Sequence, residues 1–233
     1  MVFAMSRVRL LEAVQELDWG SVRELLRARP SLITTVDRQG RNLLQLACCI
    51  STSKLHLSRS AQTRVVNVLL DQGFEIDAPV GRDKCTALFF AVARARNPLL
   101  VRRLLERGAK VERAPGGGLF AAGWWDDTEN LKLLLRAGAQ IDVEVGVTPF
   151  LACWCWKKFK AAKFLAENGA NVNYRDAKGW TALRHGVEKE FNSAWLKWLV
   201  NHGASPDIAD REGISARHKA ARKRDKRFLA ALG

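Results

Sequence analysis

Apolar residues recur along most of this chain at the spacing of an amphipathic helix. Three of these stripes are Val65-Val66-Leu69-Leu70, Leu131-Leu134-Leu135 and Leu196-Leu199-Val200. Residues three and four positions apart share one side of a helix, so each stripe predicts a helix with a single buried face. The polar residues between the stripes predict that the opposite face meets water.

A glycine follows each stripe at a regular interval. Gly73, Gly108, Gly138, Gly169 and Gly203 each lie four residues after a leucine, and the steps between them are 35, 30, 31 and 34 residues. Three residues later comes an apolar residue or proline, and then an acidic or amide residue: Asp77, Glu112, Asp142, Asn173 and Asp207. Glycine ends helices readily because it adopts a positive φ without a Cβ clash. The interval therefore predicts several copies of one structural unit.

A second, shorter helix is predicted in each unit, about ten residues after the glycine turn. Its beginning reads Thr148-Pro149-Phe150-Leu151-Ala152-Cys153 in one copy and Thr181-Ala182-Leu183-Arg184-His185-Gly186 in the next. Threonine caps helix N-termini, and proline in the first turn lacks an N–H that would have no partner there. Each unit is thus predicted as turn, helix, turn, helix.

This unit resembles the ankyrin repeat, whose signature is Thr-Pro-Leu-His-x-Ala. Residues 146–173 align with that pattern without a gap, and residues 179–207 have one extra residue between the helices. Residues 84–112 match with Pro98 between the helices, residues 40–77 carry an insertion near Ser51–Gln62, and residues 115–142 have Gly116-Gly117-Gly118 in place of Thr-Pro. The resemblance implies an all-α solenoid of stacked helix-turn-helix units with short β-hairpin turns.

The resemblance covers nearly the whole chain and predicts one domain. Repeats are expected at 37–80, 81–115, 116–145, 146–178 and 179–210, between an N-terminal cap at 9–36 and a C-terminal cap at 211–233. Terminal units of a solenoid expose one face to water, so atypical, charged ends are expected. The insertion at Ser51–Gln62 has two interpretations, an added contact or tolerated slack, and the sequence favours neither.

Composition narrows the class of protein. The chain has 233 residues, a hydrophobic fraction of 48%, and 38 Lys+Arg against 24 Asp+Glu, a formal charge of +14. These values exclude a disordered chain, and no apolar run approaches the ~20 residues that cross a bilayer. The start of the chain becomes charged too early for a secretory signal. The five cysteines, an odd number, do not form a disulfide pattern. We therefore expect a cytoplasmic protein.

Catalytic and metal chemistry find little support. The three glycines at 116–118 lack the lysine of a phosphate-binding loop, and no nucleophile motif is present. Asp126 and Asp127 are more typical of a solvated turn that caps a helix near Thr128 than of acid–base catalysis. Cys153 and Cys155 lack a second ligand pair at zinc spacing, and Cys48 and Cys153 suit small buried positions. We expect no enzyme activity, no metal and no cofactor.

The resemblance implies that a partner binds the inner surface, formed by the turns and the exposed side of the first helices. The corresponding turn positions are Arg38, Gln39, Arg41, Val147, Ala177, Lys178, Trp180, Arg211 and Glu212; the helix positions are Cys49, Ile50, Ala93, Arg94, Trp124, Trp125, Cys155, Trp156, Glu188 and Lys189. Four tryptophans fall in this set, and surface tryptophans are frequent binding hot spots. The alternative is that they pack between repeats, beside Gly123 and Gly186. Trp154, Trp195 and Trp198 are assigned to the core.

The positive charges near the tryptophans indicate the kind of partner. Trp124, Trp125, Trp156 and Trp180 are expected to anchor an acidic protein partner, surrounded by Lys157, Lys158, Lys178 and Arg184. The function expected is a non-catalytic module that sequesters, inhibits or scaffolds this partner, and that is a monomer without it. The alternative is a polyanion, nucleic acid or anionic membrane, bound by the basic C-terminal cap. No nucleic-acid reading motif accompanies that cap, so the sequence favours a protein partner.

Overall fold

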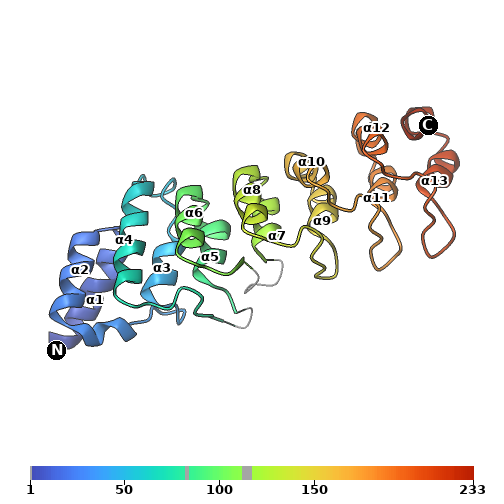
Figure 1. The fold of residues 1–233 in the computed structure, drawn as a ribbon. Helices are drawn as coiled ribbons and strands as arrows, with labels where there is room; N and C mark the ends of the chain where they lie inside the picture. The colour runs from blue at the N-terminus through green and yellow to red at the C-terminus, as the bar shows by residue number, and fades with distance from the viewer. Residues whose placement is uncertain (1, 82–83, 112–116) are drawn as a thin grey trace. The chain divides into compact units, whose positions relative to one another are not determined.

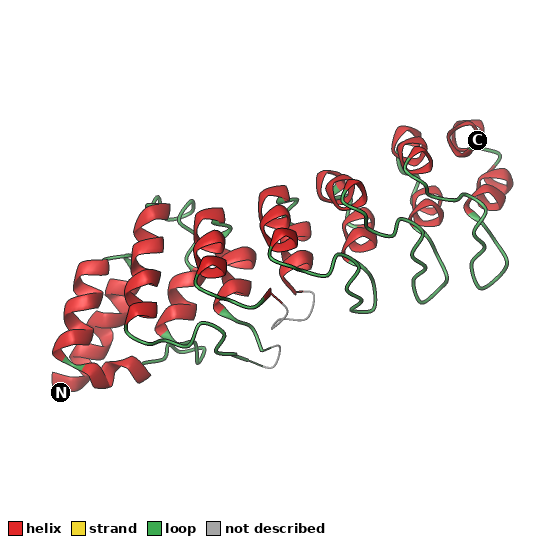
Figure 2. Ribbon diagram, in the orientation of Figure 1, coloured by secondary structure: helices red, strands yellow, loops and turns green. Residues whose placement is uncertain are grey.

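The computed structural model describes residues 2–81, 84–111 and 117–233 (Figure 1). The chain forms two compact units, Met1–Ala121 with Lys132–Ala139, and Ala122–Leu131 with Gln140–Gly233. We call them unit 1 and unit 2. The all-α fold class is confirmed: in the described ranges, helices are joined by loops and no strand forms (Figure 2). The expected hairpin turns are reduced to isolated β-bridges, Val36 with Asn42 and Val80 with Cys85.

The helices come in pairs. Unit 1 contains α1 (Val2–Gln15), α2 (Trp19–Ala28), the 3₁₀ turn η1 (Pro30–Thr34), α3 (Leu43–Cys49), α4 (Arg59–Asp71), α5 (Ala87–Phe90), the π-helical turn η2 (Ala91–Ala95) and α6 (Pro98–Glu106). The helices α7 (Gly117–Trp124) and α8 (Thr128–Arg136) follow. Unit 2 continues with α9 (Pro149–Cys155), α10 (Phe159–Glu167), α11 (Ala182–Glu188), α12 (Ser193–Asn201), α13 (Ala216–Lys223) and α14 (Lys226–Leu232).

The predicted helix boundaries are confirmed at both ends. Thr148 Oγ1 accepts the N–H of Leu151 at 3.4 Å, and Thr181 Oγ1 accepts the N–H of Arg184 at 3.3 Å, as N-caps do. At the other end of the repeat, Gly138 and Gly169 have φ values of 93° and 95°, in the region that favours glycine. Local capping therefore explains where these helices begin and end.

In unit 1, the helix pairs stack on one another. The first helices pack in the order α1, α3, α5, and the second helices in the order α2, α4, α6. The stripe residues Val65, Val66 and Leu69 are fully buried, as are Leu100 and Leu104 of α6. Burying such a side chain stabilises a fold by about 1.5–3 kcal/mol, so the amphipathic faces hold the stack together.

In unit 2, α9 packs against α11 and α11 against α13, while α12 packs against α14. Trp154 is fully buried, as predicted, and its indole Nε1 donates to the carbonyl oxygen of Ala182 at 2.8 Å. Its ring meets Phe159 edge-on at 5.4 Å. Trp195 and Trp198 are only half-buried, in contrast to the core position expected for them. Trp195 stacks on Phe159 at 4.7 Å, which covers one of its faces.

Polar side chains after the glycine turns join successive turns. Asp142 Oδ1 accepts the N–H of Asn171 at 3.0 Å, and Asn173 Oδ1 accepts the N–H of Ser205 at 2.8 Å. Asn173 Nδ2 also donates to the carbonyl oxygen of Gly203 at 2.8 Å. At Asp142 and Asn173, the recurring acidic or amide residue thus satisfies a backbone N–H in the following repeat.

The last residue of the predicted insertion at Ser51–Gln62 lies in the core. Gln62 is fully buried in α4, and its Nε2 donates to the carbonyl oxygens of Ala47 at 2.8 Å and Ile50 at 2.9 Å. Its Oε1 accepts from Nδ2 of Asn97 at 2.9 Å. Thr52, at the other end, is also buried. The last residue of the predicted insertion is therefore a structural link between α3, α4 and the segment before α6.

Candidate functional site

The candidate site lies in unit 2, where α7 and α9 end in the same way. Asp126 donates its N–H to Gly123 O at 2.9 Å with a φ of 56°, and the N–H of Asp127 reaches Ala122 O at 2.9 Å. The end of α9 repeats this closure with Lys157, whose φ is 60°. A residue with a positive φ after a helix turns the chain sharply and satisfies the last carbonyls. The helix ends therefore place their aromatic residues at equivalent positions.

Trp124, Trp125 and Trp156 form what we call the aromatic patch. Their exposed fractions are 50%, 45% and 37%, so all three present large rings to solvent. The rings of Trp124 and Trp156 lie 5.1 Å apart with an interplanar angle of 80°, an edge-to-face pair. Exposed aromatic surface of this size is typical of interaction sites.

Close packing beneath the patch brings the two helix ends together. A Cβ on Gly123 would lie 2.3 Å from the Sγ of Cys153, so only glycine fits there. A Cβ on Gly186 would lie 2.4 Å from Leu196 Cδ2 and 3.5 Å from the ring of Trp154. The space beside these glycines is thus filled by Cys153, Leu196 and Trp154. The three rings of the aromatic patch do not occupy it.

Lysines border the aromatic patch. Lys158 places its Nζ 5.6 Å from the centre of the Trp124 ring, and Lys157 places its Nζ 5.3 Å from that of Phe191. The Nζ of Lys189 donates to the carbonyl oxygen of Cys155 at 3.5 Å. Ammonium groups over aromatic faces are attracted by the ring quadrupole. The patch thus combines apolar rings with positive charge.

The two aspartates beside the patch serve as helix caps. Asp127 Oδ1 accepts the N–H of Asn130 at 3.0 Å, at the start of α8. Asp126 Oδ1 accepts the N–H of Ala161 at 2.7 Å, in the first turn of α10, whose own N-cap residue Lys158 forms no side-chain cap. Both carboxylates are therefore used by backbone donors, which agrees with the capping interpretation of this pair.

Trp180 lies in a second cluster. Its ring is 4.3 Å from the guanidinium carbon of Arg184, 5.0 Å from Lys178 Nζ and 5.1 Å from the ring of His185. The side chain is half-buried, while Lys178 is exposed. The structure thus brings Trp124 and Trp156 into contact, and it stacks Trp180 on Arg184.

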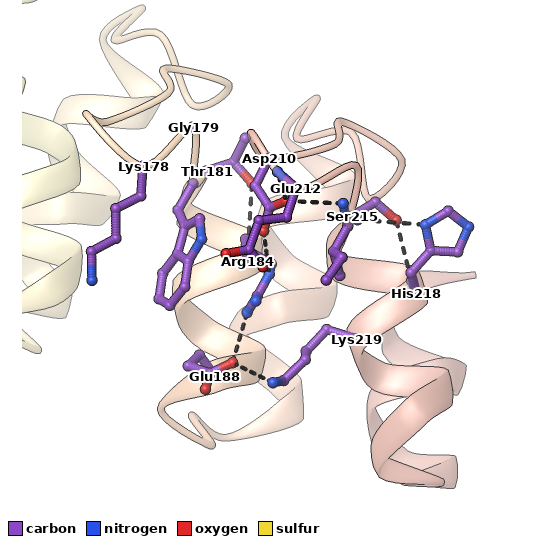
Figure 3. A network of polar contacts seen from close by, with 12 residues as sticks. Lys178, Gly179, Thr181, Arg184, Glu188, Asp210, Glu212, Ser215, His218 and Lys219 are labelled. Atoms are coloured by element: carbon purple, nitrogen blue, oxygen red, sulfur yellow. Dashed lines mark hydrogen bonds and ion pairs between the residues drawn. The ribbon is translucent and has the colours of Figure 1, made fainter.

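Arg184 is not on the surface, contrary to the expectation that it borders the binding site. It is 4% exposed, and its Nη1 donates to Glu188 Oε2 at 2.7 Å (Figure 3). Its Nε lies 3.3 Å from Asp210 Oδ2, and Lys219 Nζ lies 3.1 Å from Glu188 Oε2. The hydrogen bond from Arg184, with the help of Lys219, holds the pKa of Glu188 below its usual range. Arg184 therefore links α11 to the turn that contains Asp210, and Lys219 links Glu188 to α13.

Burial shifts the pKa values of three titratable groups in unit 2, those of His185, Cys153 and Cys155. His185 Nε2 lies 2.8 Å from Asp176 Oδ2, and burial lowers the pKa of His185. Burial also raises the pKa of Cys153 to about 12 and that of Cys155 to about 11, so both thiols are poor nucleophiles. Within the described residues, no three His, Cys, Asp or Glu side chains form a cluster that could hold a metal ion.

Part of the positive charge of the basic C-terminal cap is paired, mostly with carboxylates of the preceding repeat. Ion pairs join Arg217 to Asp207 at 2.7 Å, Lys219 to Glu188 at 3.1 Å, Lys223 to Glu190 at 2.9 Å and Arg227 to Asp225 at 2.8 Å. Arg222, Arg224 and Lys226 are exposed and have no ion pair with any residue that the structure describes. The free positive charge of this cap is thus smaller than its sequence indicates.

Comparison with known proteins identifies the family. Residues 119–210 match the family model for ankyrin repeats, in three copies. The chain contains ankyrin repeats. The ankyrin repeat domain of Bcl-3 matches with a TM-score of 0.79 at 22% identity, over 96% of this chain and 97% of that one. An ankyrin repeat domain from Acinetobacter baumannii matches with a TM-score of 0.65 at 25% identity, over 81% of this chain and 95% of that one.

A relative in sequence has nearly the same extent. The probable 26S proteasome regulatory subunit p28 of Saccharomyces cerevisiae is 25% identical over 236 residues, which cover 97% of this chain and 98% of that protein. Ankyrin repeats indicate a protein–protein interaction module, and the relatives indicate a non-catalytic one. Among the helices of the described residues, none has both the length and the apolar character required to cross a membrane.

Proposed function

We propose that this ankyrin repeat protein binds an acidic protein partner through the aromatic patch and the lysines beside it. The single observation that supports this most is the edge-to-face pair of Trp124 and Trp156, exposed at adjacent helix ends with Lys158 over the Trp124 ring. Rings held by a rigid helix end lose little conformational entropy on binding. They therefore suit the role of anchors.

Positive charge makes this surface favour an acidic partner. The chain has a formal charge of +14, Lys157 and Lys158 lie beside the aromatic patch, and Lys178 lies beside the half-buried Trp180. Such a field raises the rate of encounter with acidic partners and makes binding sensitive to salt. In this proposal, Lys178 and Trp180 extend the surface, while the buried Arg184 holds the Trp180 ring in place.

The role expected is scaffolding or sequestration of that partner. The yeast relative is named a probable regulatory subunit of the 26S proteasome, which supports a regulatory position beside a larger protein assembly. We place the free chain in the cytoplasm as a monomer. Its partner would then bind one defined surface of unit 2.

Affinity capture from the native cell tests the proposal. The wild-type chain and the double variant Trp125→Ala/Trp156→Ala serve as baits, captured proteins are identified by mass spectrometry, and the recombinant partner is titrated against both. Each hot-spot tryptophan contributes about 2 kcal/mol, so the double variant should bind at least ~30-fold more weakly. Trp198→Ala is the matched control, since Trp198 lies on α12 and stacks on His202. Equal affinity of the double variant and the wild type would refute the aromatic patch as the site.

The polyanion alternative has its own test. Deleting residues 217–233 is unsuitable because it removes the ion pair between Lys219 and Glu188 and the buried side chain of Phe228. The triple change Arg222→Gln/Arg224→Gln/Lys226→Gln removes only exposed charge. Loss of binding to single-stranded RNA or to phosphatidylserine vesicles in this variant, with partner capture unchanged, would identify a separate polyanion site on the cap.

A further inference from the structure

A second candidate site lies in unit 1. A pocket of about 560 Å³ opens between the turn before α3, the end of α3 and the segment formed by α5 and η2. Among the residues that the structure describes, its lining contains two arginines, two thiols and an apolar wall and no carboxylate: Gln39, Arg41, Cys49, Val80, Gly81, Cys85, Phe90 and Arg94. Positive charge beside apolar surface is thus the chemical character of this pocket.

Arg41 is held rigidly at one side. Its Nε donates to Asp37 Oδ2 at 2.7 Å, its Nη2 lies 2.6 Å from the same oxygen, and its Nη1 donates to Cys49 Sγ at 3.1 Å. The Asp37 carboxylate therefore neutralises and orients this guanidinium. Because Asp37 holds one edge, the Nη1 group stays directed at the Cys49 thiol that lines the pocket.

Arg94 supplies a second positive charge at the pocket. It is exposed and lies in the π-helical turn η2, and no residue in the described part of the chain forms an ion pair with it. Burial raises the pKa of the Cys49 thiol, while the charges of Arg41 and Arg94 oppose that rise. The two guanidinium groups thus act electrostatically on the same point of the pocket.

We propose that this pocket receives a glutamate or aspartate side chain from an acidic segment of a protein partner. Arg94 pairs with the carboxylate, Arg41, already paired with Asp37, offers its Nη1 edge to the same pocket, and Phe90 and Val80 cover an apolar neighbour of the acidic residue. A hydrogen-bonded pair of guanidinium and carboxylate is among the stronger polar contacts in proteins. The site extends the proposed function to unit 1 but stands on different residues, so either can fail alone.

The composition of the pocket favours a carboxylate on a peptide over a nucleic acid. Arg94 is the one cation of this pocket with no ion pair to a described residue, whereas binding to a phosphate backbone relies on many clustered Lys and Arg residues. The ring of Phe90, which Phe89 meets edge-on at 5.8 Å, and the side chain of Val80 give a peptide an apolar surface that a free small anion would not use. A single acidic residue next to an apolar one matches both features.

Thiol protection in the full-length chain tests the site directly. The probe is an acetylated, amidated peptide of glycine and serine that carries one leucine between two glutamates; the controls are the same peptide with glutamines and inorganic phosphate. Alkylation is followed by mass spectrometry at Cys49 and Cys85, which line the pocket, and at Cys155, which adjoins the aromatic patch. We expect the glutamate peptide to slow alkylation of Cys49 and Cys85 and to leave Cys155 unchanged.

Two single-residue variants test whether the charge of Arg94 binds the glutamate peptide. Arg94→Gln should weaken binding of the glutamate peptide about tenfold, since a charge-assisted hydrogen bond contributes about 1.5–3 kcal/mol. Arg102→Gln, an equal change of charge at an exposed position of α6, should leave the affinity unchanged. Equal binding of the glutamine peptide, equal protection by phosphate, or equal loss in both variants would overturn the proposal. Protection of Cys155 alone would place the peptide on the aromatic patch and also overturn it.

Discussion

Single residues decide how closely neighbouring helices approach under the aromatic patch. Gly123 has a helical backbone, so alanine would be favourable there on propensity alone. The Cβ of Gly123→Ala would nevertheless lie 2.3 Å from Cys153 Sγ. We expect this variant to lower the free energy of unfolding by about 1–3 kcal/mol, as overpacking does. Urea denaturation followed by circular dichroism measures it.

A second substitution, at Cys153, tests whether the clash with its sulfur causes the loss of stability. In the double variant Gly123→Ala/Cys153→Ala the clashing sulfur is absent, so its stability should exceed that of Gly123→Ala. If the second change lowers stability further instead, the close approach to the Cys153 sulfur is not what excludes a side chain at position 123.

Because Arg184 is buried, we expect it to stabilise the fold of unit 2. Removing one partner of a buried ion pair leaves the other charge uncompensated, which costs about 3–5 kcal/mol. Arg184→Ala leaves the buried Asp210 without its cation, and we expect a loss of about 3 kcal/mol in thermal or urea unfolding. Arg217→Ala breaks only an exposed pair with Asp207 and should have little effect. Equal effects of the two changes would show that the buried network does not stabilise unit 2.

His185 predicts a dependence of stability on pH. Burial lowers its folded pKa, and its Nδ1 is buried with no hydrogen-bond partner among the described residues. The unfolded chain therefore binds a proton more readily as the pH falls through the ordinary histidine value of about 6.5. Stability should be full above that pH and decrease below it, towards the folded pKa. Urea titrations of wild type and His185→Gln at several pH values measure this, and an unchanged pH dependence in the variant would assign it to other groups.

At the scale of the element, α10 depends on a cap from the preceding repeat. Asp126→Ala removes the acceptor for the Ala161 N–H and places alanine at a φ of 56°, so we expect a loss of about 1 kcal/mol or more in the free energy of unfolding. Asp126→Asn keeps an acceptor oxygen and tolerates a positive φ, and it should retain most of the stability. If both variants lose the same amount, the charge of Asp126 matters more than its hydrogen bond.

The helix ends show which parts of the fold the sequence predicts. Glycine marks the ends of the second helices, and the prediction from Gly138 and Gly169 is confirmed by their positive φ values. The turns two residues after the first helices α7, α9 and α11 contain Asp126, Lys157 and Glu190, which have positive φ values without being glycine. No residue type distinguishes these ends, so the sequence predicts the helices better than the turns that position the tryptophans.

At the scale of the whole molecule, the C-terminal helix pair completes the core of unit 2. Deleting residues 226–233 removes α14, and with it the buried side chains of Phe228 and Leu232. Burial of each contributes about 1.5–3 kcal/mol, so the shortened chain should unfold at a lower urea concentration and bind more of a hydrophobic dye. The triple variant at Arg222, Arg224 and Lys226 should leave both measurements unchanged. Unchanged stability after the deletion would show that α14 is dispensable.

Sequence alone determined the repeated architecture, the caps of Thr148 and Thr181 and the helical faces, because these depend on a residue and its neighbours within one or two turns. Position within a repeat also placed Trp124, Trp125 and Trp156 on expected surface positions, and they are exposed. Contacts between repeats were decided only by the tertiary structure: the burial of Arg184 by Glu188 and Asp210, the cap that Asp126 provides to α10, and the joint lining of a pocket by Arg41 and Arg94. Periodicity reports which side of its own helix a residue occupies, but it does not report which side chain of the next repeat that residue meets.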